Sequence, residues 1–464
     1  MSKNIDRRAF LQTAGSAALG AAALGGMAAL QGCAGRGKDS STGTSGDTSE
    51  PGGEMEYRIN PGSGDKVSLI GFGCMRWPMV KDENGVDVVD QETVNTLVDY
   101  AYNHGVNYYD SAPVYLQGKS EAAAGLALSR YPRGSYYVAT KMSNNRGDFS
   151  RAGGIKMYHD SLERFRTDYL DYYLLHGIGM GGVHSFEQRF LDNGLLDYLL
   201  KEREAGRIRN LGFSFHGDQE SFDHFLPLHE RYHWDFVQIE MNYQDWRHAA
   251  VPRNVNADYL YDQLDKREIP IVIMEPLLGG RLASLPTVLA QKLKEREPDR
   301  SLASWAFRFC GSYPRVLTTL SGMTRMSDLE DNMRTFCGFK PLNGQEQELL
   351  FEIADMLAAY PLVNCTNCKY CMPCPYGIDI PGVFQHYNGC VNDGSVAQST
   401  EQEDYRKLKR RYLVSYDRAL ESVRQADHCI GCGQCKPRCP QRIQIPEQLH
   451  RIAAYVESLR RDTL

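Results

Sequence analysis

The chain has 464 residues, a formal net charge of −6 and an ordinary composition, with 42% hydrophobic and 24% charged residues. This length is greater than that of a single small domain and indicates two or three folded units. The charge is nearly balanced and no long basic stripe occurs, so we expect no nucleic-acid partner. Eight of the 13 cysteines crowd into two short stretches, unlike the even spread of a disulfide framework.

Residues 1–33 have the features of an export signal. Arg7 and Arg8 precede a weakly hydrophobic run, residues 14–30, that is rich in alanine and glycine. This pattern is typical of a twin-arginine signal, and the run falls short of the ~20 strongly apolar residues of a membrane span. The run ends at Cys33 in what resembles a lipoprotein cleavage site; an incidental Cys33 is the alternative. We therefore expect an exported protein, periplasmic or tethered to a membrane by a lipid on Cys33.

Residues 34–54 are mostly Gly, Ser, Thr, Asp and Pro, which predicts a flexible linker. From residue 55 to 344, predicted strands alternate with predicted helices. Amphipathic stretches predict helices at 91–104, 185–205 and 259–267. Eight short runs rich in Val, Ile, Tyr, Phe and Leu predict the strands 67–72, 107–111, 136–141, 169–176, 208–215, 236–242, 270–275 and 316–322.

Eight strand–helix units over this length predict an α/β fold of the closed (β/α)₈ TIM barrel type. An open, doubly wound parallel sheet is the alternative fold. That fold usually carries a Gly-x-Gly-x-x-Gly turn after its first strand, and no such turn follows residues 67–72. The sequence therefore favours the barrel.

Polar, proton-handling residues follow three consecutive predicted strands. Asp110 ends the second strand and Tyr115 lies in its loop, while Lys141 ends the third strand and His176 the fourth. Each residue alone is common as a cap or a core group. Together they indicate chemistry, because the C-terminal ends of barrel strands open at one face, where these folds place their active sites.

Hydride reduction of a carbonyl needs a proton donor at the oxygen, where negative charge develops. A tyrosine has a pKa near ~10 and becomes a better donor beside an ammonium that lowers this value. We therefore interpret Tyr115 as the proton donor, with Lys141 lowering its pKa and Asp110 holding Lys141 charged. We expect His176 to hydrogen-bond the carbonyl oxygen and orient it.

These residues lie in segments that resemble the aldo/keto reductase family. The resemblance is carried by residues 109–115, 118–121, 139–141, 171–176, 212–214, 238–243, 274–277, 322–325 and 330–332. The family's tetrad of Asp, Tyr, Lys and His maps onto the same four positions. The resemblance implies a nicotinamide cofactor across the barrel mouth, usually NADP(H), with NAD(H) as the alternative.

The resemblance also implies which side chains border this cofactor. They are Ser214, Gln238 and Asn242 at the nicotinamide half, and Gly322, Arg325 and Asn332 at the adenosine half. Arg325 is the evident partner for a 2′-phosphate, since a guanidinium suits phosphate. A solvated charge at a helix start is the alternative interpretation of Arg325.

Residues 345–464 contain two motifs of four cysteines, each closed by a Cys-Pro pair. They are Cys365, Cys368, Cys371 and Cys374, then Cys429, Cys432, Cys435 and Cys439. The second motif has the bacterial ferredoxin spacing, in which three cysteines bind one [4Fe–4S] cluster and the fourth binds the other. Zinc is the competing metal, because paired Cys-x₂-Cys units also build tetrahedral sites.

The first motif has two residues, not three, before its last cysteine, which leaves open whether Cys374 or the nearby Cys390 serves the second cluster. A small buried hydrophobe is the alternative interpretation of Cys390. Residues 374–381 echo residues 439–446, as expected for two related half-domains, and a charged amphipathic helix predicted at 401–424 would pack between them. We expect a small, mainly helical, two-cluster ferredoxin-like domain, which resembles that of the iron–sulfur subgroup of aldo/keto reductases.

Together these features predict an exported oxidoreductase that interconverts a carbonyl and an alcohol at Tyr115, with two clusters exchanging electrons with a redox partner protein. An electron carrier that uses the barrel only as a binding scaffold is one alternative. A reductase with purely structural clusters is another. The small carbonyl or alcohol substrate stays open, with sugars, aldehydes and ketones all compatible, because specificity resides in variable loops, here residues 178–185 and 244–256.

Overall fold

The computed structural model describes residues 51–144, 148–249 and 254–464. The predicted export signal, its Arg7–Arg8 pair, Cys33 and most of the linker lie outside the described residues. Within the described part of the chain, no helix combines the length and the apolarity that crossing a membrane requires.

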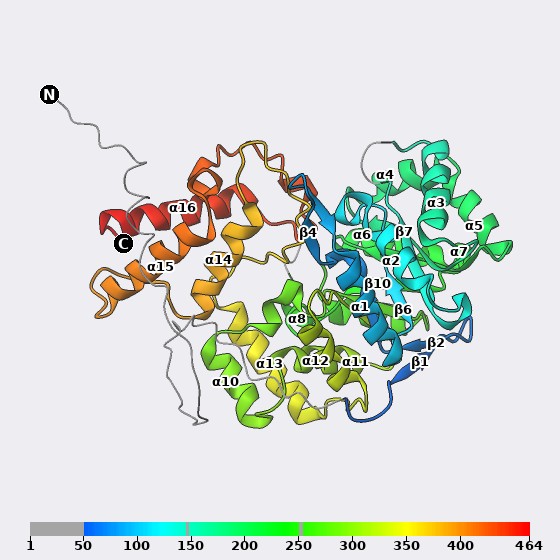
Figure 1. Ribbon diagram of the computed structural model, residues 1–464, viewed down its shortest axis with the longest axis horizontal. Helices are drawn as coiled ribbons and strands as arrows, with labels where there is room; N and C mark the ends of the chain where they lie inside the picture. The colour runs from blue at the N-terminus through cyan, green and yellow to red at the C-terminus, as the bar shows by residue number, and fades with distance from the viewer. Residues whose placement is uncertain (1–50, 145–147, 250–253) are drawn as a thin grey trace, which may run out of the picture. The chain divides into compact units, whose positions relative to one another are not determined.

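Eight parallel strands close into a barrel surrounded by helices (Figure 1). Around the barrel the strands follow chain order, and the last pairs with the first. They are β3 (Ile70–Gly73), β6 (Tyr108–Asp110), β7 (Tyr137–Met142), β8 (Leu170–Ile178), β9 (Ile208–Phe215), β10 (Phe236–Glu240), β11 (Ile271–Met274) and β12 (Val316–Ser321). Each overlaps a predicted strand, so the predicted fold class is confirmed.

Large side chains fill the barrel interior. Tyr172 packs edge-on against Tyr108 and Phe236, with ring centroids 5.0 and 5.1 Å apart, and all three are fully buried. Leu317 and Val272 belong to the same inner core. Because the interior is packed, the barrel is not a pore, and its chemistry has to occur at the strand ends.

A β-hairpin lies at the N-terminal end of the barrel. The predicted first strand is divided at Leu69, and its first part, β2 (Lys66–Ser68), pairs antiparallel with β1 (Tyr57–Ile59). Asp65, in the turn, accepts hydrogen bonds from the Tyr172 hydroxyl (2.9 Å) and from Asn210 Nδ2 (3.1 Å). A polar network therefore ties the hairpin to this end of the barrel, opposite the C-terminal strand ends.

Long helices cover the outside of the barrel. In α1 (Gln91–Asn103), the Asp90 side chain caps the amide of Thr93, and an apolar face that includes Val94 and Leu97 is buried. The other long ones are α2 (Ser120–Leu128), α3 (Arg151–Phe165), α5 (Leu195–Glu204), α9 (Ala257–Asp265), α10 (Thr287–Arg296), α11 (Leu302–Gly311), α12 (Met326–Phe336) and α13 (Gly344–Ala358).

The single helix predicted at 185–205 is wrong. The segment forms α4 (Gly182–Phe186), a π-helical turn (Glu187–Leu191) and α5, which begins only after Gly194. Gly194 has a φ of 67°, a left-handed conformation that interrupts the helix and favours glycine.

A second hydrophobic core starts at Val363 and is built on three helices, α14 (Ile380–Asn392), α15 (Tyr405–Ala419) and α16 (Ile445–Arg461). The buried residues of α13 belong to the barrel core, so the domain boundary expected at residue 345 falls at the start of a helix that packs with the barrel. Helix α15 is shorter than the predicted 401–424. It packs against α14 and α16, each of which follows one cysteine motif (Figure 1).

Candidate functional site

The structure brings Asp110 and Lys141 into direct contact at neighbouring strand ends. Asp110 is the last residue of β6 and Lys141 lies near the end of β7, so the two side chains meet at the C-terminal end of the barrel. The Lys141 ammonium donates hydrogen bonds to the Asp110 carboxylate and to the carbonyl oxygen of Ser111, the latter at 2.8 Å. Both side chains are almost completely buried.

Tyr115 and His176 lie beside this ion pair. Tyr115 begins a 3₁₀ turn in which Leu116 (φ 49°) and Gln117 (φ 57°) adopt left-handed conformations. Its ring centroid lies 5.1 Å from Lys141 Nζ and 6.0 Å from the His176 ring, which meets it edge-on. All four residues predicted from the strand ends therefore converge at one place.

Ser143 contacts the His176 ring, and Arg189 holds the His176 backbone. Ser143 Oγ lies 2.6 Å from His176 Nδ1, and Arg189 Nη2 donates to the His176 carbonyl oxygen at 2.6 Å. Arg189 comes from the π-helical turn and also donates to Asn144 Oδ1 at 3.1 Å. Burial lowers the pKa of Arg189 to about 9. These supporting residues could not be predicted from the sequence, because a π-helical turn has no recognisable pattern.

The expected lowering of the Tyr115 pKa is wrong in direction. Burial raises the pKa of Tyr115 well above 10, and the nearby acidic groups of Tyr370, Asp110 and Glu275 raise it further. The Lys141 ammonium is engaged by Asp110 and Ser111, so it adds little net positive charge beside the phenol. Burial likewise raises the pKa of Asp110, and Lys141 opposes this shift. Tyr115 is therefore held in its protonated form.

The residues expected at the nicotinamide half differ in their surroundings. Gln238 Nε2 donates to Asp110 Oδ2 at 3.4 Å, and Ser214 Oγ accepts from the Gly177 amide at 2.9 Å, so both lie beside the tetrad. The Asn242 side chain instead holds its own loop, with Nδ2 donating to Asp245 Oδ2 (2.9 Å).

The residues expected at the adenosine half follow β12. Gly322 lies against the Arg76 side chain, and Asn332 is buried in α12, where Nδ2 donates to Ser321 Oγ at 3.0 Å. Arg325 is 76% exposed and forms an ion pair with Asp328 at 2.8 Å. Of these three, Arg325 alone presents a charged side chain to solvent.

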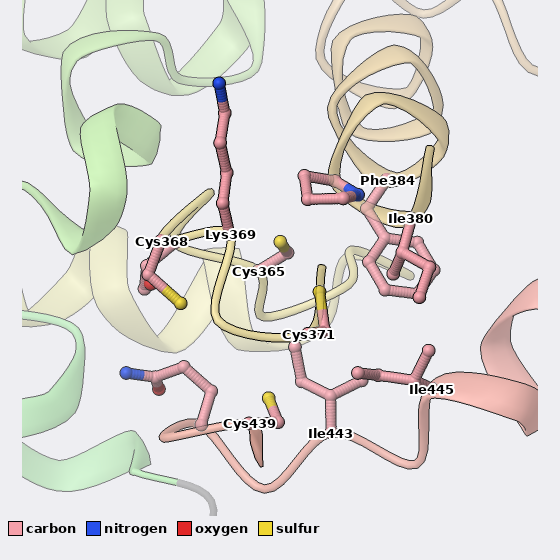
Figure 2. Close-up of a pocket in the computed structure, with 12 residues that line it drawn as sticks. Cys365, Cys368, Lys369, Cys371, Ile380, Phe384, Cys439, Ile443 and Ile445 are labelled. Atoms are coloured by element: carbon pink, nitrogen blue, oxygen red, sulfur yellow. The ribbon is translucent and has the colours of Figure 1, made fainter. Parts of the chain in front are cut away.

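The cysteines form two sets that each draw on both motifs. Figure 2 shows the first set, Cys365, Cys368, Cys371 and Cys439, around a pocket with an apolar wall of Ile380, Phe384, Ile443 and Ile445. The second set lies around Cys435. Its other members are Cys374, Cys429 and Cys432, which lie near enough to raise the pKa of Cys435. Cys374 thus joins the second motif. Cys390 lies elsewhere, with Sγ 3.6 Å from His386 Nε2.

The first set suits a group that carries positive charge. Burial raises the pKa of Cys365 to about 11 and that of Cys368 to about 12, so thiolates in this pocket need cations such as iron ions beside them. Among the described residues, no three His, Cys, Asp or Glu side chains are grouped tightly enough to hold a single metal ion.

The segments that carry the first set dock onto the mouth of the barrel, by which we mean the C-terminal strand ends and their loops. Arg76 Nη2 donates to the Thr366 carbonyl oxygen at 2.5 Å, and a Cβ on Gly279 would lie 2.2 Å from Thr366 Cα. Further contacts are Arg281 Nη1 to Asn364 Oδ1 (2.9 Å), Gln441 Nε2 to Glu240 Oε1 (3.0 Å) and Arg442 Nη1 to Asp218 Oδ2 (3.3 Å). The first set therefore lies over the C-terminal ends of the barrel strands.

Three acidic residues, Glu240, Asp245 and Glu275, lie beneath this interface. Burial, together with the neighbouring charge of Glu240, raises the pKa of Glu275 to about 7 and that of Asp245 to about 7. Glu275 directly follows β11. The strand-end argument that identifies Asp110 applies to Glu275 as well, and the sequence analysis missed it.

Comparison with known proteins identifies both parts of the chain. A model of the aldo/keto reductase family matches residues 69–354, and a model of a 4Fe–4S dicluster domain matches residues 364–445. The chain is 26% identical to L-galactose dehydrogenase from Arabidopsis thaliana, with 68% of this chain and 97% of that protein covered. It is 31% identical to versiconal hemiacetal acetate reductase from Aspergillus parasiticus, with 49% and 69% covered.

Solved structures resemble the barrel. An aldo-keto reductase from Bacillus halodurans in its holo form superposes with a TM-score of 0.52 at 23% identity, covering 65% of this chain and 96% of that one. An aldo-keto reductase from Klebsiella pneumoniae in complex with NADPH gives a TM-score of 0.50 at 18% identity, covering 68% and 98%. At these identities the likeness concerns the fold.

Proposed function

Since this chain belongs to the aldo/keto reductase family and carries a 4Fe–4S domain, we propose that it interconverts a small carbonyl compound and its alcohol, with Tyr115 as the proton donor. The observation that carries this proposal is the convergence of Asp110, Tyr115, Lys141 and His176 at one end of the barrel. A bound nicotinamide would supply the hydride that adds to the carbonyl carbon.

The chain's own residues handle the oxygen and the proton. A carbonyl oxygen between Tyr115 and His176 would be oriented by both rings, whose centroids are 6.0 Å apart. As negative charge develops on that oxygen, Tyr115 donates its proton to it. Lys141, fixed by Asp110, then lies beside the phenolate that remains. In the reverse direction the phenolate accepts the proton of the alcohol.

NADP(H) is the proposed nicotinamide, with NAD(H) as the alternative. The residues present fit such a cofactor, because Ser214 and Gln238 lie beside the tetrad and Arg325 is exposed after β12. On cofactor binding, the Arg325 guanidinium could leave its ion pair with Asp328 and pair with the 2′-phosphate.

We further propose one [4Fe–4S] cluster in each cysteine set, with electrons passing between the clusters, the barrel and a redox partner protein. The position of the first set over the mouth supports this proposal. Export through the twin-arginine route, with these groups already bound, and a tether at Cys33 complete the proposal and rest on residues 1–33 alone.

The test uses protein purified without oxygen, with iron and sulfide counted first. Carbonyl compounds are screened with NADPH and NADH, and the Tyr115→Phe variant is compared with Tyr376→Phe, which changes an exposed tyrosine that follows Cys374. We expect Tyr115→Phe to lower turnover about 10²-fold or more, the usual effect of removing a proton donor, and Tyr376→Phe to leave turnover unchanged. Unchanged turnover in Tyr115→Phe would contradict the assigned chemistry.

The cluster proposal has its own readout. Addition of NADPH should produce the electron paramagnetic resonance signal of a reduced cluster. If dithionite produces that signal and neither nicotinamide does, electron exchange between the barrel and the clusters is ruled out under these conditions, whatever the result with Tyr115→Phe.

A further inference from the structure

Helix α15 separates its apolar and charged side chains onto two opposite faces. One face lies in the second hydrophobic core and consists of buried aromatic and aliphatic residues, namely Tyr405, Leu408, Tyr412 and Tyr416. The opposite face is exposed to solvent and holds cations around a single valine, namely Lys407, Arg410, Arg411, Val414 and Arg418. At 3.6 residues per turn, these five positions lie within about 100° of one another. We call them the cationic face of α15.

The cationic face has few acidic partners. Arg411 forms an ion pair with Asp393 at 3.3 Å. The single acidic residue within α15, Asp417, pairs with Arg460 of α16 at 3.7 Å. The other cations of the face form no ion pair with any residue that the structure describes, and they are Lys407, Arg410 and Arg418. Positive charge on this face is therefore largely uncompensated by the protein.

A helix face that is only solvated usually pairs opposite charges along its length. Lys156 and Asp160 do so on α3, four residues apart and with an Nζ–Oδ1 distance of 2.7 Å. Lys407 and Arg411 have the same spacing on α15 but the same sign, and like charges at this spacing disfavour a helix. The whole chain has a net charge of −6, so its composition does not explain this clustering of cations. The cationic face therefore indicates an anionic partner.

An anionic membrane surface fits this face better than an acidic protein does. The centre of a protein–protein interface is usually built on large apolar or aromatic side chains, and charged residues are depleted there. The cationic face offers only Val414 as an apolar group, and that side chain is 42% exposed. Lipid headgroups require no fixed geometry, and basic side chains beside a small apolar surface are typical of helices that lie on a membrane.

We propose that the cationic face of α15 binds the surface of a membrane that contains anionic phospholipids. The basic side chains would contact the lipid phosphates, and Val414 would enter the headgroup layer. The lipid proposed on Cys33 would raise the local concentration of α15 at such a surface, although the face does not need that lipid in order to bind. This inference concerns a different surface from the mouth and does not rest on the chemistry proposed for Tyr115.

The test measures co-sedimentation of the full chain with lipid vesicles. Every protein carries Cys33→Ser, so that no lipid is attached there. One set of vesicles contains equal parts of phosphatidylglycerol and phosphatidylcholine, and the other contains phosphatidylcholine alone. The protein should bind the anionic vesicles, and this binding should weaken as the salt concentration rises, because salt screens exposed charges.

A triple variant, Lys407→Gln with Arg410→Gln and Arg418→Gln, removes three cations from the face. It should lower the partition coefficient onto anionic vesicles about 100-fold, because each basic residue near such a surface contributes about a factor of five. On phosphatidylcholine alone, this difference should disappear. A charge-conserving variant should bind as the parent protein does, since the proposal depends on charge, and it consists of Lys407→Arg, Arg410→Lys and Arg418→Lys.

The matched control removes the same charge from exposed positions on three other helices. It combines Lys201→Gln on α5, Arg231→Gln on α7 (His229–Tyr232) and Arg296→Gln on α10. Its binding should stay close to that of the parent protein. Iron content establishes that each variant keeps its clusters, so that lost binding is not lost folding.

Equal binding of the parent protein and the triple variant to anionic vesicles would overturn the proposal, as would an equal loss in the matched control. Soluble polyglutamate distinguishes the other partner class. If polyglutamate binds the parent protein but not the triple variant, while the vesicles bind both alike, the cationic face serves an acidic protein and the membrane proposal is wrong.

Discussion

Lys141 donates a hydrogen bond to Asp110 inside the barrel, where the two side chains are only 1% and 4% exposed. A buried ion pair of this kind depends on both partners, because the loss of one leaves a charge in a medium that solvates it poorly. Among the described residues, the hydrogen bond left to the Asp110 carboxylate once Lys141 is removed is the 3.4 Å contact with Gln238.

Lys141→Met should therefore destabilise the protein by about 3–5 kcal/mol, the usual result of breaking a buried pair. Urea denaturation followed by tryptophan fluorescence measures this loss. The double variant Lys141→Met with Asp110→Leu removes both charges and should recover much of the stability. If the single variant is as stable as wild type, the pair does not contribute to stability as the burial implies.

Gly279 and Gly280 provide a matched test of the domain interface. Both have positive φ values, 69° and 96°, but only Gly279 faces Thr366; nothing lies within 4 Å of a Cβ on Gly280. Gly279→Ala should loosen the cysteine domain and speed the loss of visible cluster absorbance in the presence of an iron chelator. Gly280→Ala should cost only the ~1–2 kcal/mol of left-handed strain. Equal rates of cluster loss in the two variants would argue against this contact.

The assignment of cysteines to two sets predicts which cluster each serine variant loses. Cys439→Ser should impair the cluster held by Cys365, Cys368 and Cys371, and Cys374→Ser the other one. Each variant should lose about four irons, those of one cubane. Cys390→Ser should keep the full iron content, because Cys390 belongs to neither set. Iron analysis and electron paramagnetic resonance check these outcomes, and loss of iron in Cys390→Ser alone would reverse the assignment.

The raised pKa of Glu275 predicts that the free energy of unfolding depends on pH. Its pKa is raised from 4.5 to about 7, so the folded state binds this proton more tightly than the unfolded state. The resulting stabilisation is complete below about pH 4.5 and is lost as the pH rises through 7. Glu275→Gln should therefore be more stable than wild type at pH 8 and show a flatter profile between pH 5 and 8. Asp245 retains its own dependence in the same direction.

Thermal unfolding across this pH range measures the effect, and Glu352→Gln, at an exposed position on α13, is the control. That control should follow the wild-type profile. Parallel profiles for wild type and Glu275→Gln would show that Glu275 does not titrate in this window.

The barrel could be predicted because each strand is a local signal. Runs such as residues 208–215 combine β-branched and aromatic side chains between turn residues, and the structure forms β9 over the same residues. Asp110, Lys141 and His176 could be found because a strand end fixes which way a polar side chain faces. The same argument would have identified Glu275.

The interface could not be predicted, because its contacts join positions with no common pattern. Gln441 and Glu240 are separated by 201 residues, and Thr366 meets Gly279 through its backbone, which any residue could supply. The direction of the Tyr115 pKa shift was missed for the same reason. It depends on burial and on Tyr370, which belongs to the cysteine domain.

Because each cysteine set takes ligands from both motifs, neither set is complete until the second motif has been synthesised. The first set needs Cys439. A cluster there can therefore be completed only after the ribosome has synthesised the entire barrel and the helices α14 and α15. Cluster insertion is thus expected after most of the chain has been synthesised, when the barrel loops that hold Thr366 and Gln441 are already made. Biogenesis of this protein is expected to run in one order, with the barrel first and the iron last.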